Sequence, residues 1–194
     1  MSPAWRTRFV HDIAQYLFSY YLESLVRFKA VPPDMEHVLE IRRDTIATRP
    51  TITAGEAACG SELAFPIILS EPFHRLRIIC ADAVAVQNDA YGLFRDLGRT
   101  ELNQAVVLIR HHEYTPEQAL HHLEQSHDEL IGQYQQLEQR ALTQAERYGL
   151  PEEKLNVEGY LSTMRSLLSG NDAWSRETAR YNDHVPSSWT WTTA

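Results

Sequence analysis

The chain has 194 residues, a length that suits one domain with a buried core. Its 26 acidic and 18 basic residues give a formal net charge of -8, which argues against nucleic acid or an anionic membrane surface as the main partner. The two cysteines, Cys59 and Cys80, lie in apolar surroundings, so we expect core thiols in a reducing cytoplasm and no disulfide framework. No apolar run approaches the roughly 18 residues that a membrane span needs.

The first third of the chain predicts helices separated by breaks. Apolar residues recur at intervals of three and four from Trp5 to Phe28, which predicts a long amphipathic helix. VPPD at 31–34 ends that helix, and Asp34 then stands where it would cap a second helix over 35–45. Residues 46–62 lose the periodicity and contain proline and glycine, which predicts a broken or kinked helix.

The rest of the chain is predicted to be helical as well. The segment that follows Pro72 reads as a helix to Asp96, and the segment 101–113 as another. Thr115 and the proline after it are typical of the start of a long polar helix, and a last helix is predicted from Pro151 to Gly170. No strand pattern of comparable strength occurs. We therefore predict an all-α fold, an antiparallel helix bundle.

A line of polar residues marks the end of the helix that reaches Asp96. Asn88, Gly92 and Asp96 are four residues apart, so on a helix they stack along one face over about two turns. The small side chains upstream, such as Ala85, would let this face border a cavity. Amide and carboxylate oxygens are hard donors of the kind that Mg²⁺ selects. On spacing alone, a solvated polar helix face is the alternative.

Two further clusters carry groups that bind phosphate or build a pocket. Arg42 and Arg43 lie near the end of the second predicted helix, and guanidinium groups pair bidentately with phosphate. The segment GNDAWSRETARY, residues 170–181, combines aromatic and arginine side chains. The alternatives are ordinary surface arginines for the first cluster, and a cap on the fold formed by Trp174 and Tyr181 for the second.

Taken together, NDAYGLFRD, GNDAWSRETARY and PPDMEHVLEIRRDT resemble the C-terminal half of a bacterial class I terpene synthase. That family carries an Asn-Asp-x-x-Ser-x-x-x-Glu magnesium motif and a C-terminal Trp-Ser-x-x-Thr-x-Arg-Tyr motif. The second motif is matched by Trp174, Ser175, Thr178, Arg180 and Tyr181. The resemblance implies the C-terminal part of the class I terpenoid synthase fold over residues 1–182, followed by a tail, 183–194, that we expect to be disordered.

The resemblance also implies roles for individual residues. Asn88, Gly92 and Asp96 would be the ligands of one Mg²⁺, with glycine in place of the usual serine and aspartate in place of glutamate. Arg42 falls where the diphosphate-sensing arginine is expected, and Arg43 is the fallback. The resemblance further implies that Arg95, Arg180 and Tyr181 bind the diphosphate and that Trp174 and Ala85 form a pocket wall. The implied catalytic residues are Arg42, Arg180 and Tyr181.

The implied activity is the Mg²⁺-dependent ionisation of a prenyl diphosphate, geranyl or farnesyl, followed by cyclisation of the carbocation. The family's other metal motif, Asp-Asp-x-x-Asp, does not occur in this chain. The alternative function is therefore a non-catalytic truncated remnant or a helical interaction subunit. As partners we expect a second copy of the chain or a missing N-terminal half supplied in trans, because a partial bundle should expose apolar faces.

Overall fold

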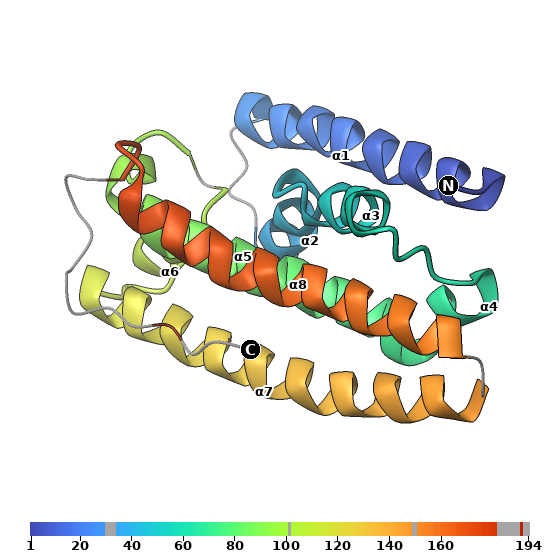
Figure 1. Cartoon of the computed structure of the whole chain (residues 1–194). Coiled ribbons are helices and arrows are strands. Elements are labelled where there is room, and N and C mark those ends of the chain that lie inside the picture. The colour runs from blue at the N-terminus through green and yellow to red at the C-terminus, as the bar shows by residue number, and fades with distance from the viewer. Residues whose placement is uncertain (30–33, 101, 149–150, 182–190, 192–194) are drawn as a thin grey trace.

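The computed structural model describes residues 1–29, 34–100, 102–148, 151–181 and 191 (Figure 1). Over these residues the chain is helical and has no strand, which confirms the all-α prediction. The helices are α1 (Pro3–Lys29), α2 (Met35–Thr45), α3 (Thr48–Cys59), α4 (Phe65–Ile68), α5 (Glu71–Asp96), α6 (Gln104–His111), α7 (Pro116–Tyr148) and α8 (Pro151–Glu177).

α5 is the central helix of the bundle. It packs against five other helices, α2, α3, α6, α7 and α8. Figure 1 shows α1 lying over α2 and α3, with α7 on the opposite side of the molecule. The largest apolar core lies between α5, α7 and α8, where Phe73, Tyr134, Tyr160 and Met164 are fully buried. This core fixes the position of α5, on which the predicted metal ligands lie.

Two predicted helix starts are confirmed by their caps. The Asp34 carboxylate accepts a hydrogen bond from the backbone N–H of His37 at 2.9 Å, which caps α2. At the start of α7, Thr115 Oγ1 accepts from the Gln118 N–H at 3.2 Å, and the Thr115 N–H donates to Gln118 Oε1 at 2.8 Å. This reciprocal pair is a capping box, and it satisfies two backbone donors at once.

The predicted break over 46–62 is narrower than expected. Residues 48–59 form the regular helix α3, and the breaks lie at Ala47 and Gly60, with φ of 60° and 65°. Pro50 lies in the first turn of α3, where its missing N–H would have had no helical partner. The proline that suggested a broken helix is therefore compatible with an ordinary one.

Two other predicted boundaries were wrong. The last helix does not end at Gly170 but continues to Glu177, because one glycine costs a helix only about 1 kcal/mol and Ser175 beyond it is buried. The helix predicted over 101–113 begins at Gln104. Asn103 caps it, with its side-chain oxygen accepting from the Val106 N–H at 3.3 Å.

α1 is held to the bundle by polar contacts. Its Asp12 is buried and accepts hydrogen bonds from Arg77 Nη2 at 2.6 Å and Thr53 Oγ1 at 2.5 Å. The charges can be buried because they are paired and hydrogen-bonded. The opposite side of α1 carries an exposed apolar stripe, which we call the α1 stripe and which consists of Val10, Leu17, Phe18, Tyr21 and Phe28.

The two cysteines are both free thiols, but they differ in environment. Cys80 is buried in the core as predicted, whereas Cys59 is exposed because it lies in the last turn of α3. Among the described residues, no helix is long and apolar enough to cross a membrane. The predicted disordered tail, 183–194, lies outside the described residues except at Trp191, which is buried and donates to Tyr91 OH at 3.2 Å.

Candidate functional site

A polar cavity of about 310 Å³ lies where α1, α2, α5 and the chain beyond α8 meet. Its polar lining consists of Tyr16, Tyr20, Glu23, Arg27, Arg42, Thr45, Asn88, Arg95, Asp96, Thr100 and Arg180. Five of these residues were predicted from the sequence to belong to one site, although they come from segments far apart in the chain. The bundle thus brings Arg42, Asn88, Arg95, Asp96 and Arg180 together.

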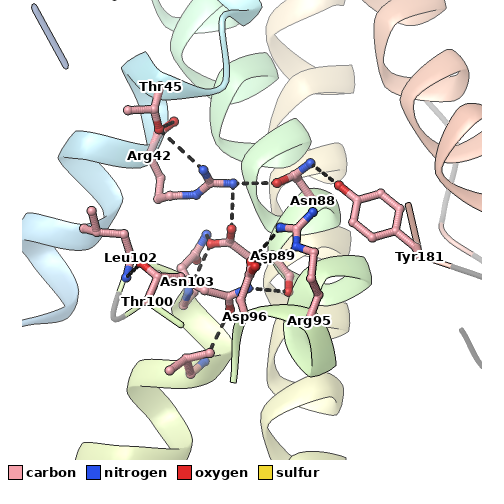
Figure 2. A network of polar contacts seen from close by, with 12 residues as sticks. Arg42, Thr45, Asn88, Asp89, Arg95, Asp96, Thr100, Leu102, Asn103 and Tyr181 are labelled. Atoms are coloured by element: carbon pink, nitrogen blue, oxygen red, sulfur yellow. Dashed lines mark hydrogen bonds and ion pairs between the residues drawn. The ribbon is translucent and has the colours of Figure 1, made fainter. Parts of the chain in front are cut away.

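Arg42 is the centre of the polar network in Figure 2. Its Nη2 donates to Asn88 Oδ1 at 2.8 Å and forms an ion pair with Asp89 Oδ1 at 2.7 Å. The other oxygen of Asp89 accepts from the backbone N–H and the side-chain amide of Gln104, at 3.0 and 3.1 Å. Burial raises the pKa of the Asp89 carboxyl, and the Arg42 guanidinium opposes that rise. Asp89 therefore fixes the direction in which Arg42 points.

Tyr181 closes the other side of Asn88. The amide Nδ2 of Asn88 donates to the Tyr181 hydroxyl at 2.8 Å. The Tyr181 ring is buried, and the guanidinium carbons of Arg95 and Arg180 lie 5.2 and 5.6 Å from its centroid. These are cation–π distances, so the aromatic ring holds two cationic side chains at the edge of the cavity.

Asp96 is paired with the residue before it. Arg95 donates from Nε to Asp96 Oδ1 at 2.7 Å and from Nη2 to Asp96 Oδ2 at 2.8 Å, and Asn103 Nδ2 lies 3.2 Å from Oδ2. Gly92 leaves room for this pair, because a Cβ at position 92 would lie 2.9 Å from Asp96 Oδ2 and 3.1 Å from Arg95 Nη2. The Arg95–Asp96 pair occupies the space that a side chain at position 92 would fill.

Five predicted site residues do not line the cavity: Gly92 and Tyr181 lie against residues that do, and the other three lie elsewhere. Arg43 is not among the residues lining the cavity, and it donates to both carboxylate oxygens of Asp82, at 2.7 and 3.0 Å. Ala85 is buried inside the bundle, and Trp174 is half exposed with its ring edge-on to Tyr181; neither lines the cavity. Of the two arginines considered for diphosphate sensing, Arg42 is therefore the one that faces the site.

From the sequence, Tyr16 is a candidate for the pocket wall but core packing is favoured for it, and the other residues that α1 contributes were missed. Tyr16, Tyr20, Glu23 and Arg27 all line the cavity, and their spacing of four, three and four is the signal that could have identified a common face. The hydroxyls of Tyr16 and Tyr20 are 2.9 Å apart, and this hydrogen bond raises the pKa of Tyr20 to about 12. The pair adds two aromatic side chains to a cavity that is otherwise lined mainly by charged and polar groups.

The oxygen donors fit a metal that is shared with a bound anion. Asn88 and Asp96 supply hard oxygens to the same cavity, whereas Gly92 supplies no side-chain ligand. No cluster of three or more His, Cys, Asp or Glu side chains suited to a metal occurs in the described ranges. Mg²⁺ is commonly held by one or two protein oxygens together with phosphate oxygens and water. The site fits that arrangement but not a cage built by the protein alone.

Comparison with known proteins identifies the family. Residues 1–133 match the family model described as terpene synthase family 2, C-terminal metal binding, and the chain belongs to this family. It is 29% identical over 182 residues to pristinol synthase of Streptomyces pristinaespiralis, covering 93% of this chain and 49% of that protein. It is also 29% identical over 185 residues to pentalenene synthase of Streptomyces avermitilis, covering 93% of this chain and 55% of that enzyme. The chain thus spans about half the length of these relatives.

Solved structures confirm the fold. A linalool/nerolidol synthase from Streptomyces clavuligerus, in complex with 2-fluorogeranyl diphosphate, superposes with a TM-score of 0.84 at 23% identity, over 91% of this chain and 60% of that one. 2-Methylisoborneol synthase from Streptomyces coelicolor A3(2), in complex with Mg²⁺ and geranyl-S-thiolodiphosphate, superposes with a TM-score of 0.78 at 23% identity. The match covers 97% of this chain and 57% of that one. The predicted resemblance to terpene synthases and the predicted helical fold are both confirmed.

Proposed function

We propose that this chain forms the diphosphate-binding half of a Mg²⁺-dependent class I terpene synthase that acts on a geranyl or farnesyl diphosphate. The observation that supports the proposal most strongly is the cavity that Arg42, Asn88, Asp96 and Arg180 line together. The solved relatives described above bind diphosphate-containing molecules. We further propose a cytoplasmic location, because both cysteines are free thiols.

In the proposed reaction the protein stabilises a departing diphosphate. Arg42 and Arg180 place fixed positive charge where negative charge develops on the leaving oxygens, and Tyr181 holds Arg180 in position through its ring. Asn88 and Asp96 would hold Mg²⁺, which supplies additional positive charge to the diphosphate when it is bound. The rings of Tyr16 and Tyr20 would face the carbocation with their negative quadrupole.

The proposed partner is the remaining half of the fold. The α1 stripe leaves Phe28 88% and Val10 66% exposed, and monomeric proteins rarely expose such continuous apolar faces. Because the chain spans about half of its relatives, we propose that helices equivalent to their other half cover this stripe, either joined to this chain or on a separate polypeptide. A second copy of the chain is the alternative partner.

A non-catalytic remnant is the second candidate function. It is favoured by Gly92, which removes one ligand oxygen, and by the Arg95–Asp96 pair that occupies the space. The two functions differ in what they predict for the metal. A remnant would bind neither Mg²⁺ nor a prenyl diphosphate in this cavity.

The test is release of inorganic diphosphate from geranyl and farnesyl diphosphates by the purified chain, with and without Mg²⁺. We expect Mg²⁺-dependent release that is lost in Asn88→Ala and kept in Asn156→Ala, a matched change near the start of α8. If the chain alone is inactive, the assay is repeated with an added N-terminal half from a relative. Absence of release in both formats, or release that Asn88→Ala leaves unchanged, would contradict the proposal.

A further inference from the structure

Every side-chain oxygen that Asn88 and Asp96 could offer to a metal faces an arginine. Asn88 Oδ1 accepts from Arg42 at 2.8 Å, and the two oxygens of Asp96 accept from Arg95 at 2.7 and 2.8 Å. A Mg²⁺ ion binds oxygen at about 2.0 to 2.1 Å, so it would have to stand beside two guanidinium groups. While Arg42 and Arg95 keep these positions, their positive charge opposes metal binding at these residues.

The Arg95–Asp96 pair depends on Gly92. With a side chain at position 92, the Cβ would lie 2.9 Å from one Asp96 oxygen and 3.1 Å from Arg95 Nη2, which is too close for both to stay where they are. The atoms in the way are the far ends of flexible side chains, so they could move at low cost. Glycine at this position thus permits the closed pair, and an alanine would open it.

The cavity carries a surplus of positive charge. Arg27, Arg42, Arg95 and Arg180 line it, against the lining carboxylates of Glu23 and Asp96 and the Asp89 carboxylate that pairs with Arg42 behind it, so four positive charges minus three negative charges leave one. Arg42 Nε and Arg95 Nη1 are buried without a hydrogen-bond partner in the described structure. Both arginines therefore have donor capacity that their present partners do not use, and guanidinium groups bind phosphate oxygens bidentately.

We infer that an anion of the diphosphate class binds this cavity without a metal and frees the metal ligands, an inference that rests on the proposed function. The anion draws Arg42 and Arg95 onto its oxygens, and Asn88 and Asp96 then become available to Mg²⁺. Linkage requires that anion and metal tighten each other's binding by the same factor, which for coupled sites is typically about 5- to 150-fold. Arg95 is in this account a positioning residue that closes the metal site until the anion is present.

In the first experiment, inorganic diphosphate is titrated into the whole chain in excess EDTA, and calorimetry measures the heat of binding. We expect saturable binding at one site that weakens as salt is raised. The second experiment measures Mn²⁺ binding without any anion, from the electron paramagnetic resonance signal of free Mn²⁺, which avoids chelation of the metal by diphosphate. We expect weak binding to the unaltered protein.

Two variants separate the effects on anion and metal. Arg95→Gln should weaken diphosphate binding and, by releasing Asp96, tighten Mn²⁺ binding about 10-fold, within the range typical of coupled sites. Gly92→Ala, which crowds the Arg95–Asp96 pair without adding a ligand oxygen, should also tighten Mn²⁺ binding while it keeps every arginine. The matched control is Arg75→Gln, which removes the same charge from the same helix at a residue paired with Glu71, and it should change neither affinity.

The outcomes distinguish the inference from the function on which it rests. Diphosphate binding that requires a metal, or Mn²⁺ affinity that Arg95→Gln leaves unchanged or lowers, would overturn the inference and leave the proposed function standing. If neither diphosphate nor Mn²⁺ binds to any form, alone or together, the proposed function fails as well. Opposite shifts in the two affinities on Arg95→Gln would support the inference.

Discussion

Asn88 donates a hydrogen bond to the hydroxyl of Tyr181 at 2.8 Å, although 93 residues separate the two in the chain. The bond connects α5 with the turn that follows α8, and Arg180 lies in that turn. A residue predicted to bind metal and a residue predicted to bind diphosphate are therefore held in one arrangement.

Tyr181→Phe should weaken diphosphate binding by about 3- to 10-fold and lower the free energy of unfolding by about 1 kcal/mol, the usual contribution of one hydrogen bond. The ring stays beside Arg95 and Arg180, so only the hydroxyl is removed. Calorimetric titration and urea unfolding measure the two effects. Tyr114→Phe, at an exposed position, is the control. Equal affinities for the Tyr181→Phe variant and the parent would show that the hydroxyl does not organise the site.

Arg42→Gln and Arg43→Gln should have different effects, although the two arginines are neighbours. Arg42 lines the cavity, so its loss should weaken diphosphate binding by 10-fold or more, as expected for a charge-assisted bond of about 1.5 to 3 kcal/mol. Arg43 pairs with Asp82, so its loss should cost about 1 kcal/mol of stability and little affinity. Calorimetric titrations with diphosphate and urea unfolding curves of both variants measure the two effects. The reverse pattern would make Arg43 the diphosphate-sensing residue.

Ala47→Gly should raise the free energy of unfolding by about 0.5 to 1 kcal/mol. Ala47 has φ of 60°, in the left-handed region that costs a residue with a Cβ about 1 to 2 kcal/mol, and glycine removes that cost while it adds a smaller entropy to the unfolded chain. Ala54→Gly, inside α3 and exposed, should lower stability by about 1 kcal/mol. Urea unfolding should therefore give opposite signs for the same substitution, and equal signs would be inconsistent with the strained break.

The stability of the fold should fall on acidification because of His127. Its Nε2 lies 3.0 Å from the Gln87 amide nitrogen, and the Gln87 carbonyl accepts from Asn171 at 2.8 Å. Gln87 must therefore donate, which requires a neutral His127 with Nε2 as the acceptor. Burial lowers the pKa of His127 from 6.5 to about 4, although Asp128 and Asp172 oppose the shift.

Because the folded pKa is depressed, the unfolded chain takes up this proton at higher pH than the folded protein does. The contribution of neutral His127 to the free energy of unfolding is complete above pH 6.5, falls as the pH drops through that value and is lost near pH 4. Its total is about 3 kcal/mol. Urea unfolding of the parent and of His127→Gln at pH 7.5, 6 and 5 isolates this group from buried carboxyls. A stability difference between the two proteins that stays constant with pH would rule out His127 as the source of the pH dependence.

Replacing Phe18 and Phe28 of the α1 stripe by glutamine should reduce self-association and dye binding to apolar surface without loss of stability. Phe18 is 54% and Phe28 88% exposed, so neither substitution removes a buried contact. Analytical ultracentrifugation and dye fluorescence measure the change. Replacement of Phe73, fully buried in the core, by glutamine should instead unfold the protein. If the surface variants associate as strongly as the parent, another face is responsible.

The helices were predictable because their periodicity and caps are local. Asp34 and Thr115 stand at helix starts that the sequence marks by residue type alone. The end of α8 was missed because Gly170, a residue that often follows a helix, lies inside one whose later turns pack on the bundle. Tertiary contacts decided that boundary, and they are not visible in the local pattern.

The fold places several of the predicted site residues in one cavity, and their roles stay predictions. Arg42, Asn88, Asp96 and Arg180 line one cavity because the bundle brings α2, α5 and the chain beyond α8 together. The pairing of Arg42 with Asp89 and of Arg95 with Asp96 could not be read from spacing, since it depends on side-chain direction and on the space that Gly92 leaves. In α1 the apolar periodicity favours core packing for Tyr16, and only the fold shows that Tyr20, Glu23 and Arg27 border the same cavity.

The most direct test of the account is a crystal structure of the chain grown with Mn²⁺ and inorganic diphosphate, with anomalous data that locate the metal. The account predicts a Mn²⁺ ion bonded to Asn88 Oδ1, to an Asp96 oxygen and to the diphosphate, with Arg42 and Arg95 moved onto the diphosphate. Diphosphate bound elsewhere, or bound in this cavity while Arg95 still pairs with Asp96 and no anomalous peak lies beside Asn88, would contradict it.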